Sequence, residues 1–279
     1  MADRRRKKAA RDFVAKSQQL EAYRLKAKLK KANRARVAAL RALDAAEARN
    51  GIIAGIREAE GPTITPRLRS PKRPEATAIT LCSDWHVEER VDPGTVAGRN
   101  TYSPQEAEKR AIRLFDRAAD MTNLAAKAQE VRDAVIWLGG DLITGHIHED
   151  GLEGNHLSPT EAVIFAQRLA HTGILSYLEQ TSIEQVRVVC SYGNHGRTTP
   201  RRRVATAAKN SFEWLMYHNL AAATADDERI QVHVANGSQI YADIYGWRVR
   251  FHHGDDVRGG AAGLEAPVRR AVDAWDTVK

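Results

Sequence analysis

The chain has 279 residues, 43% of them hydrophobic, and a formal net charge of +8. That length suits one large domain, or one domain with an appendage. No run approaches the roughly 18 apolar residues of a membrane span, and no apolar segment follows the basic N-terminus, so we expect neither a membrane protein nor a secretory signal. Residues 1–50 hold 16 Lys and Arg against 5 Asp and Glu, a net of +11 that leaves −3 for the remainder.

Residues 1–50 are predicted to form a long basic helix. They are rich in Ala, Lys, Arg and Leu and contain no Pro, and these are strong helix formers. Their apolar residues do not keep a heptad spacing, which argues against a long coiled coil. The segment is either a solvated basic helix or an arm that binds nucleic acid through its phosphates. A further alternative is that the helix binds a second copy of the chain and the protein oligomerises.

A linker is predicted over residues 51–76, where Gly and Pro recur. The globular domain is then expected to span 77–279. It opens with a strand over 77–82, which ends in Ser83-Asp84-Trp85-His86. Ser103-Pro104-Gln105-Glu106 has the pattern of a capping box with proline at the first helical position, and predicts a helix to about residue 128.

The stretch around which the domain is organised is Ala134 to Leu138, followed by Gly139-Gly140-Asp141. An apolar run of this length bounded by glycine is typical of a buried strand. A second capping box at Ser158–Glu161 predicts a helix to about residue 180. The remaining elements are predicted as a strand over 186–190, a helix around 205–223, strands over 230–234, 239–245 and 247–253, and a helix over 264–278.

Strands alternate with helices in the first half of this domain and follow one another near its end. The pattern predicts an α/β sandwich, with helices on the outer faces of mixed sheets. Cys82 and Cys190 each end a predicted buried strand. They are expected to be core thiols in a reducing compartment, and a cytoplasmic location follows from that.

Polar side chains follow several of the predicted strands. They are Asp84 with His86, Gly140-Asp141, Gly193-Asn194-His195 and His253-Gly254. Carboxylate, imidazole and amide oxygen suit hard or borderline divalent ions such as Mn, Fe or Zn. Open α/β folds place their sites where strands end. Two ions about 3.5–4 Å apart would clamp a phosphoryl group and activate a water molecule.

This ordered set resembles the calcineurin-like metallophosphoesterase superfamily over roughly residues 77–279. The stretch Phe251-His252-His253-Gly254-Asp255 looks closest to the phage-encoded and DNA-repair-nuclease-like members. The resemblance implies an αββα sandwich and two divalent ions, with Mn preferred and Fe or Zn as alternatives. It makes Asp84 and His86 ligands of the first metal, Asp141 the bridge, and Asn194 and His253 ligands of the second.

The resemblance gives His195 a catalytic role without metal ligation, in which it protonates the leaving oxygen or stabilises charge there. It also implies phosphate contacts for Arg197, with Arg201–Arg203 as weaker candidates. His148 is expected to line the substrate cleft. His252 is an alternative to His253, because strand alternation brings one of the two into the site.

The chain departs from the family pattern at two points. Thr144 stands where the family often has a second Asp. The family also ends with a Gly-His-x-His motif, whose literal match at Gly145-His146-Ile147-His148 lies in the wrong order and is interpreted as a coincidence. No histidine follows His253, so the domain is predicted to be C-terminally incomplete.

The predicted function is metal-dependent hydrolysis of phosphodiester bonds in nucleic acid. One alternative is a catalytically impaired nucleic-acid-binding protein that acts through its basic N-terminal arm. Another is a phosphomonoesterase that acts on a small molecule or a protein.

Overall fold

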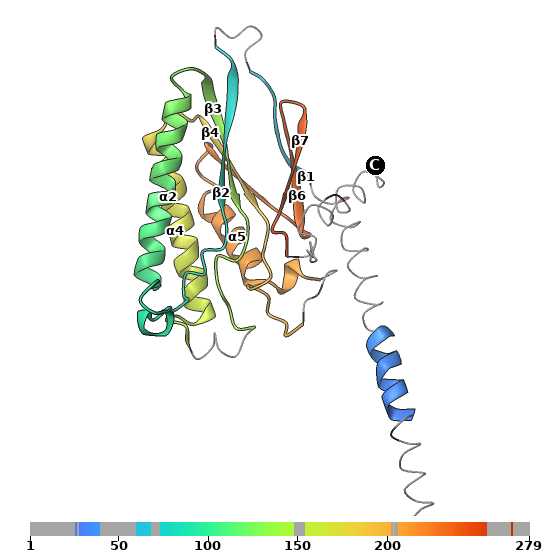
Figure 1. The fold of residues 1–279 in the computed structure, drawn as a ribbon. Coiled ribbons are helices and arrows are strands. Elements are labelled where there is room, and N and C mark those ends of the chain that lie inside the picture. Colours follow the sequence, from blue (N-terminus) through green and yellow to red (C-terminus); the bar gives the residue numbers. More distant parts are fainter. Residues whose placement is uncertain are drawn as a thin grey trace, which may run out of the picture. The chain divides into compact units, whose positions relative to one another are not determined.

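The computed structural model describes residues 26, 28–39, 60–67, 73–147, 154–201, 203, 206–255 and 269. The chain divides into two units, Met1–Arg49 and Asn50–Lys279. In the first unit residues 28–39 are helical and exposed, and Figure 1 draws them in blue. Residue 26 is helical as well, and the rest of the helix predicted over 1–50 lies outside the described residues. No helix in the described part has the length and apolar character needed to cross a bilayer.

A four-stranded parallel sheet forms the centre of the second unit. Its strands lie side by side in chain order: β2 (Glu75–Cys82), β3 (Glu130–Leu138), β4 (Gln185–Cys190) and β5 (Ile230–Val234). The helices that connect them are α2 (Pro104–Ala125), α4 (Pro159–Gln180) and α5 (Phe212–Ala223). Right-handed crossovers that always advance in one direction place every helix on one face, and the three lie together there (Figure 1).

Local sequence signals explain where these helices begin. Ser103 caps α2 by accepting a hydrogen bond from the backbone N–H of Glu106, and Ser158 with Glu161 forms a complete capping box on α4. Both helix starts are therefore confirmed. The helix predicted around 205–223 begins later, because a 3-10 turn over Ala208–Asn210 precedes α5 and Ser211 caps it.

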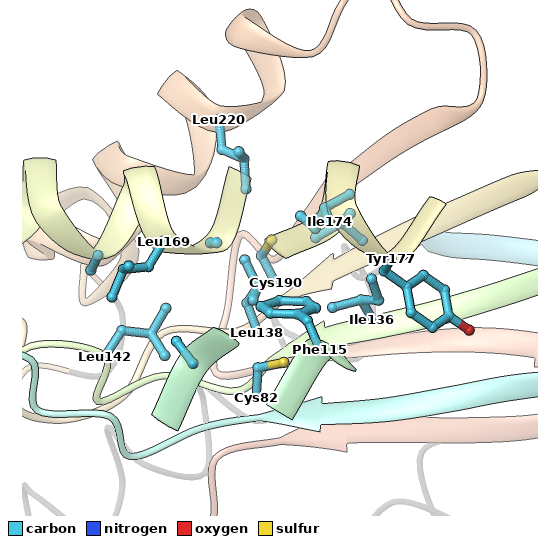
Figure 2. Packing of buried hydrophobic residues seen from close by; sticks show 14 of the residues in the cluster. Cys82, Phe115, Ile136, Leu138, Leu142, Leu169, Ile174, Tyr177, Cys190 and Leu220 are labelled. Carbon is cyan, nitrogen blue, oxygen red and sulfur yellow. The ribbon is translucent and has the colours of Figure 1, made fainter. Parts of the chain in front are cut away.

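The alternation along β3 separates two hydrophobic cores. Ala134, Ile136 and Leu138 point toward the helices, where Figure 2 shows Ile136 and Leu138 near Phe115 and Ile174. Val135 points the other way, into a second core. Successive side chains of a strand point to opposite faces, so a strand buried on both faces is a continuous apolar run.

The second core lies between the four-stranded sheet and a three-stranded sheet. The order in that sheet is β1 (Glu60–Ile64), β6 (Gln239–Ile244) and β7 (Trp247–His252), with β1 parallel and β7 antiparallel to β6. Ile240, Ala242 and Phe251 form its inner face. The turn predicted at Tyr245-Gly246 is confirmed, since both residues have positive φ, as a two-residue hairpin loop requires.

The predicted linker over 51–76 is wrong for residues 60–64, which form β1. The signal was missed because Gly61 and Pro62 interrupt the strand pattern, while pairing with β6 supplies the stabilisation. The α/β class is confirmed. The α-helices whose bounds are described in this unit lie on one face of the two-sheet stack. Of the helix predicted over 264–278 the structure describes Arg269, which is helical, so the bounds of that helix stay a prediction.

Candidate metal centre

The turns after β2 and β3 run alongside each other at the carboxyl end of the parallel sheet. The backbone N–H of Asp84 donates to the carbonyl of Gly140 at 3.0 Å, and that of His86 donates to the carbonyl of Asp141 at 3.1 Å. Val87 continues this pairing to Leu142 at 3.0 Å. These bonds fix the relative positions of three predicted ligands.

Three predicted ligands have left-handed backbone conformations. The φ angles are 57° for Asp84, 46° for His86 and 51° for Asp141. Such values cost non-glycine residues roughly 1 kcal/mol or more each and cluster at functional sites. The turns are therefore shaped against local preference, which is consistent with a requirement for these side-chain directions.

Two glycines allow the turns after β3 and β4 to touch. A Cβ on Gly140, whose φ is 89°, would lie 2.1 Å from the backbone nitrogen of Gly193. A Cβ on Gly193 would lie 2.1 Å from Oδ1 of Asp141. Any side chain at either position would separate the two turns.

Asp141 lies at the centre of the cluster, with 5% of its side chain exposed. Its Oδ1 accepts the backbone N–H of His195 at 2.8 Å, and its Oδ2 lies 3.0 Å from Nε2 of His253. Burial by itself would raise the pKa of Asp141. The hydrogen bonds from His253 and His195 outweigh that effect and lower it.

The end of β7 brings His253, and not His252, against Asp141. Nδ1 of His253 lies 2.8 Å from the carbonyl of Gly139. A carbonyl only accepts hydrogen bonds, so Nδ1 carries a proton and Nε2 faces the carboxylate. Burial would lower the pKa of His253, but the hydrogen bond and charge of Asp141 raise it to about 9.

Thr144 holds two further imidazoles. Its hydroxyl lies 3.2 Å from Nδ1 of His86, and its carbonyl lies 3.2 Å from Nδ1 of His195. The two rings meet edge to face, with centroids 4.9 Å apart. Burial is the main cause that lowers the pKa of His86, which favours the neutral ring that a metal ligand needs.

Two groups of potential ligands share Asp141. One consists of Asp84, Asp141 and His253, and the other of His86, Asp141 and His195; within each, the ligand atoms lie within 4.8 Å of one another. The grouping differs from the one that the resemblance implies. Asp84 lies with His253 instead of His86, and His195 lies among the potential ligands.

The donor set fits divalent ions. An ion with bonds of about 2.0–2.2 Å separates its ligand atoms by roughly 3–4 Å, so each group needs only a small contraction. Ligating histidines generally donate their second ring N–H to a carbonyl or carboxylate. His253 and His195 both make this contact, through Gly139 and Thr144. Imidazole with carboxylate suits Mn, Fe or Zn.

The other predicted site residues have varied environments. Asn194 lies between Gly193 and His195 in the turn after β4, and its carbonyl accepts Nη1 of Arg197 at 2.6 Å. Nε of Arg197 donates to the carbonyl of Thr199 at 3.2 Å. The guanidinium therefore braces its own loop, and its predicted phosphate contact stays a prediction. Trp85 packs edge to face on Phe115, with centroids 6.4 Å apart.

Part of the predicted substrate side lies outside the described residues. His148 and Arg202 are among those, so their roles stay predictions. The ring of His146 packs edge to face on Phe212, with centroids 5.8 Å apart. His146 therefore has a packing contact that accounts for its position without a ligand.

Two buried carboxylates behind the site were missed from the sequence. Glu213 on α5 accepts the backbone N–H groups of Leu142 and Gly193, and burial together with the charge of Asp141 raises its pKa to about 7. Glu88 accepts the N–H groups of Thr144 and Gly145, and burial raises its pKa. Glu213 stands among the apolar residues that open α5, which is a weak sequence signal for burial, and Glu88 lies in a charged loop beside Glu89 and Arg90, so neither residue attracted a prediction.

Comparison with known proteins adds no family assignment. No family model matches the chain, and no curated protein matches its sequence.

Proposed function

We propose that the Asn50–Lys279 unit is a metal-dependent phosphoesterase of the calcineurin-like type, which hydrolyses phosphodiester bonds in nucleic acid with two divalent ions that share Asp141. The observation that carries the proposal is that Asp141 belongs to two groups of potential ligands at once. A carboxylate shared by two histidine-containing groups is the arrangement a bridging ligand needs. Two stacked sheets with helices on one face, and this cluster at the strand ends, support the layered α/β part of that family's sandwich.

The ions, when bound, would supply Lewis-acid polarisation of the phosphoryl group and activation of a water molecule. The chain's own residues supply orientation. Oδ1 of Asp141 is held by the N–H of His195, and the Gly139 carbonyl directs Nε2 of His253 toward Oδ2. Asp84 is exposed and accepts a hydrogen bond from Ser83, so the cluster opens to solvent on the side of the turn after β2.

The geometry of His195 is compatible with two roles, metal ligation and proton transfer. Its Nδ1 contact with the Thr144 carbonyl makes Nε2 the basic nitrogen of the neutral ring. From there it can ligate an ion as the neutral ring or, once Nε2 has taken up a proton from solvent, donate that proton to the leaving oxygen. His195→Gln separates the two: loss of bound Mn indicates ligation, whereas retained Mn with a larger loss for poor leaving groups than for p-nitrophenol indicates proton transfer.

The central test is hydrolysis of bis-p-nitrophenyl phosphate and of DNA with added Mn, comparing the wild type with Asp141→Asn. We expect Mn-dependent turnover in the wild type and a loss of about a hundredfold to a thousandfold or more in the variant, the range found when one transition-state-stabilising group is removed. Equal turnover in the two would reject the mechanism. Preference for p-nitrophenyl phosphate over the diester would favour a phosphomonoesterase.

A second candidate function, nucleic-acid binding through the first unit, rests on its charge. The helical residues 26 and 28–39 carry six cations and no acidic residue: Lys26, Lys28, Lys30, Lys31, Arg34 and Arg36. Each phosphate that such a helix neutralises releases counterions and makes the affinity salt-dependent. Self-association would bring these like charges together, which makes a polyanion the better partner.

The test of this candidate is DNA binding at several salt concentrations by the full chain and by a variant in which Lys26, Lys30 and Arg34 are replaced by Gln. These positions follow one face of the helix at a spacing of four. We expect weaker binding and a salt dependence that is lower by about one unit of slope per lost phosphate contact. An unchanged slope would exclude the helix as the binding element.

A further inference from the structure

We propose that Glu213 is a positioning residue, whose two carboxylate oxygens hold the Asp141 turn and the Asn194–His195 turn in register so that the ligand cluster forms. The inference rests on the proposed function, because it assigns the cluster to metal binding. The geometry that carries it is independent of any ion.

Each oxygen of Glu213 serves a different turn. Oε1 accepts the backbone N–H of Leu142 at 2.6 Å, and Oε2 accepts the backbone N–H of Gly193 at 2.8 Å. Leu142 follows the central aspartate directly, and Gly193 precedes Asn194. The side chain is fully buried, so no water competes for these N–H groups and their loss would leave two buried donors unpaired.

The start of α5 is fixed to the same turn. The backbone N–H of Phe212 donates to the carbonyl of Gly196 at 2.8 Å. Cγ of Glu213 lies only 2.7 Å from the place of a Cβ on Gly196. The helix start, the carboxylate and the turn after β4 therefore pack closely against one another.

The consequence for the site runs through Asp141. Its Oδ1 is held by the N–H of His195, which belongs to the other turn. If the two turns separate, this bond and the shared position of Asp141 between the two ligand groups are lost together. Partners of this kind behind a metal site typically contribute 10–100-fold in metal affinity.

Glu88 provides a matched comparison. Its Oε1 accepts both the Thr144 and the Gly145 N–H groups at 2.8 Å, while its Oε2 is buried with no hydrogen-bond partner. Glu88→Gln therefore keeps an oxygen for both donors. Glu213→Gln cannot, because its amide NH₂ would face a backbone N–H in one turn or the other. The two substitutions remove the same charge and change the donor pattern differently.

The experiment compares the full-length wild type, Glu213→Gln and Glu88→Gln at a temperature where circular dichroism shows all three folded. Mn affinity is measured by titration calorimetry. We expect Glu213→Gln to weaken Mn binding about tenfold or more and Glu88→Gln to weaken it less. Equal affinity of Glu213→Gln and wild type, even with lower stability, would show a purely structural carboxylate and overturn the inference. Equal losses in both variants would instead assign the effect to charge and also overturn it.

A metal-free readout separates this inference from the proposed function. If the wild type binds no Mn, the proposed function fails, and amide hydrogen exchange of Leu142, Gly193 and His195 then decides the positioning role. Faster exchange at all three in Glu213→Gln, with little change in Glu88→Gln, supports it; unchanged exchange rejects it. If Glu213→Gln does not fold, Glu213→Asp keeps both oxygens on a shorter stem and should show a smaller but measurable loss, with wild-type behaviour contradicting the role.

Discussion

Two buried aspartates at opposite ends of the same stretch have different partners. Asp133 lies near the start of β3 and Asp141 just beyond its end, each with 5% of its side chain exposed. Arg67 and Arg187 both donate to Oδ1 of Asp133, the former at 2.7 Å. Asp141 instead pairs with His253 and with the N–H of His195.

The partner, and not burial, separates a structural carboxylate from a candidate ligand. A guanidinium is a permanent cation that offers only donors, so Arg67 and Arg187 act as fixed structural partners of Asp133. An imidazole can lose its proton, and its nitrogen and the carboxylate can then bind an ion together. The Asp133 network ties Arg67, which follows β1, to the four-stranded sheet. In the Asp141 cluster, a metal ion can replace the proton shared with His253.

The largest expected difference between the two aspartates is in metal binding. Asp141→Asn should remove measurable Mn binding, with at least a hundredfold loss of affinity, because both ligand groups include this carboxylate. Elemental analysis and calorimetry of the purified chain would measure it. Asp133→Asn is the control and should keep the wild-type number of ions per folded chain; a loss there would break the distinction.

The next largest effect is on stability, and here we expect the larger loss for the Asp133 variant. Asp133→Asn should lower the free energy of unfolding by about 3–5 kcal/mol, because removing one partner leaves the buried Arg187 uncompensated. Urea denaturation of the metal-free protein would measure it. If Asp141→Asn lowered the free energy of unfolding more than Asp133→Asn did, the assignment of the structural role to Asp133 would be contradicted.

A pH effect follows from His253. Its pKa of about 9 in the folded protein exceeds the usual 6.5, so its stabilisation is fully present below pH 6.5 and is lost as the pH rises toward 9. The metal-free protein should lose up to roughly 3 kcal/mol across that range. Urea denaturation with a chelator between pH 7 and 9 checks this. The series starts at pH 7 because the pKa of Glu213 is about 7, and below it the titration of Glu213 would add to that of His253. His253→Gln should flatten the profile; an unaltered slope would mean that His253 is not paired with Asp141.

The smallest effect concerns Arg67, which is one third exposed and also pairs with Glu184 at 2.6 Å. Arg67→Lys keeps the charge but cannot contact Asp133 and Glu184 with a planar fork. We expect a loss of about 1 kcal/mol in unfolding free energy and no change in Mn affinity. A loss as large as that of Asp133→Asn would show that Arg67, and not Arg187, compensates the buried charge.

The sequence predicted the elements whose signals are local. β3 was found because Ala134 to Leu138 is a continuous apolar run that ends at two glycines, and α4 because Ser158 and Glu161 form a capping box. β1 was not found, because its five residues include Gly61 and Pro62 and its stability comes from pairing with β6, about 180 residues further along the chain. Pairing between distant segments leaves little trace in either one.

By itself, the sequence determined the order of polar residues at the strand ends, and thus that Asp84, His86, Asp141, His195 and His253 could meet. Parallel strands bring their carboxyl ends to one edge, so the meeting of the four residues that follow β2, β3 and β4 follows from the alternation of strands and helices. His253 follows β7 of the other sheet, and its place against Asp141 comes from the packing of the two sheets. Only the tertiary structure decided that Asp84 groups with His253 and His86 with His195, and that Glu213 joins the two turns. The physical reason is that these contacts depend on left-handed turns and on a helix start packed behind them, both of which are set by the surrounding fold.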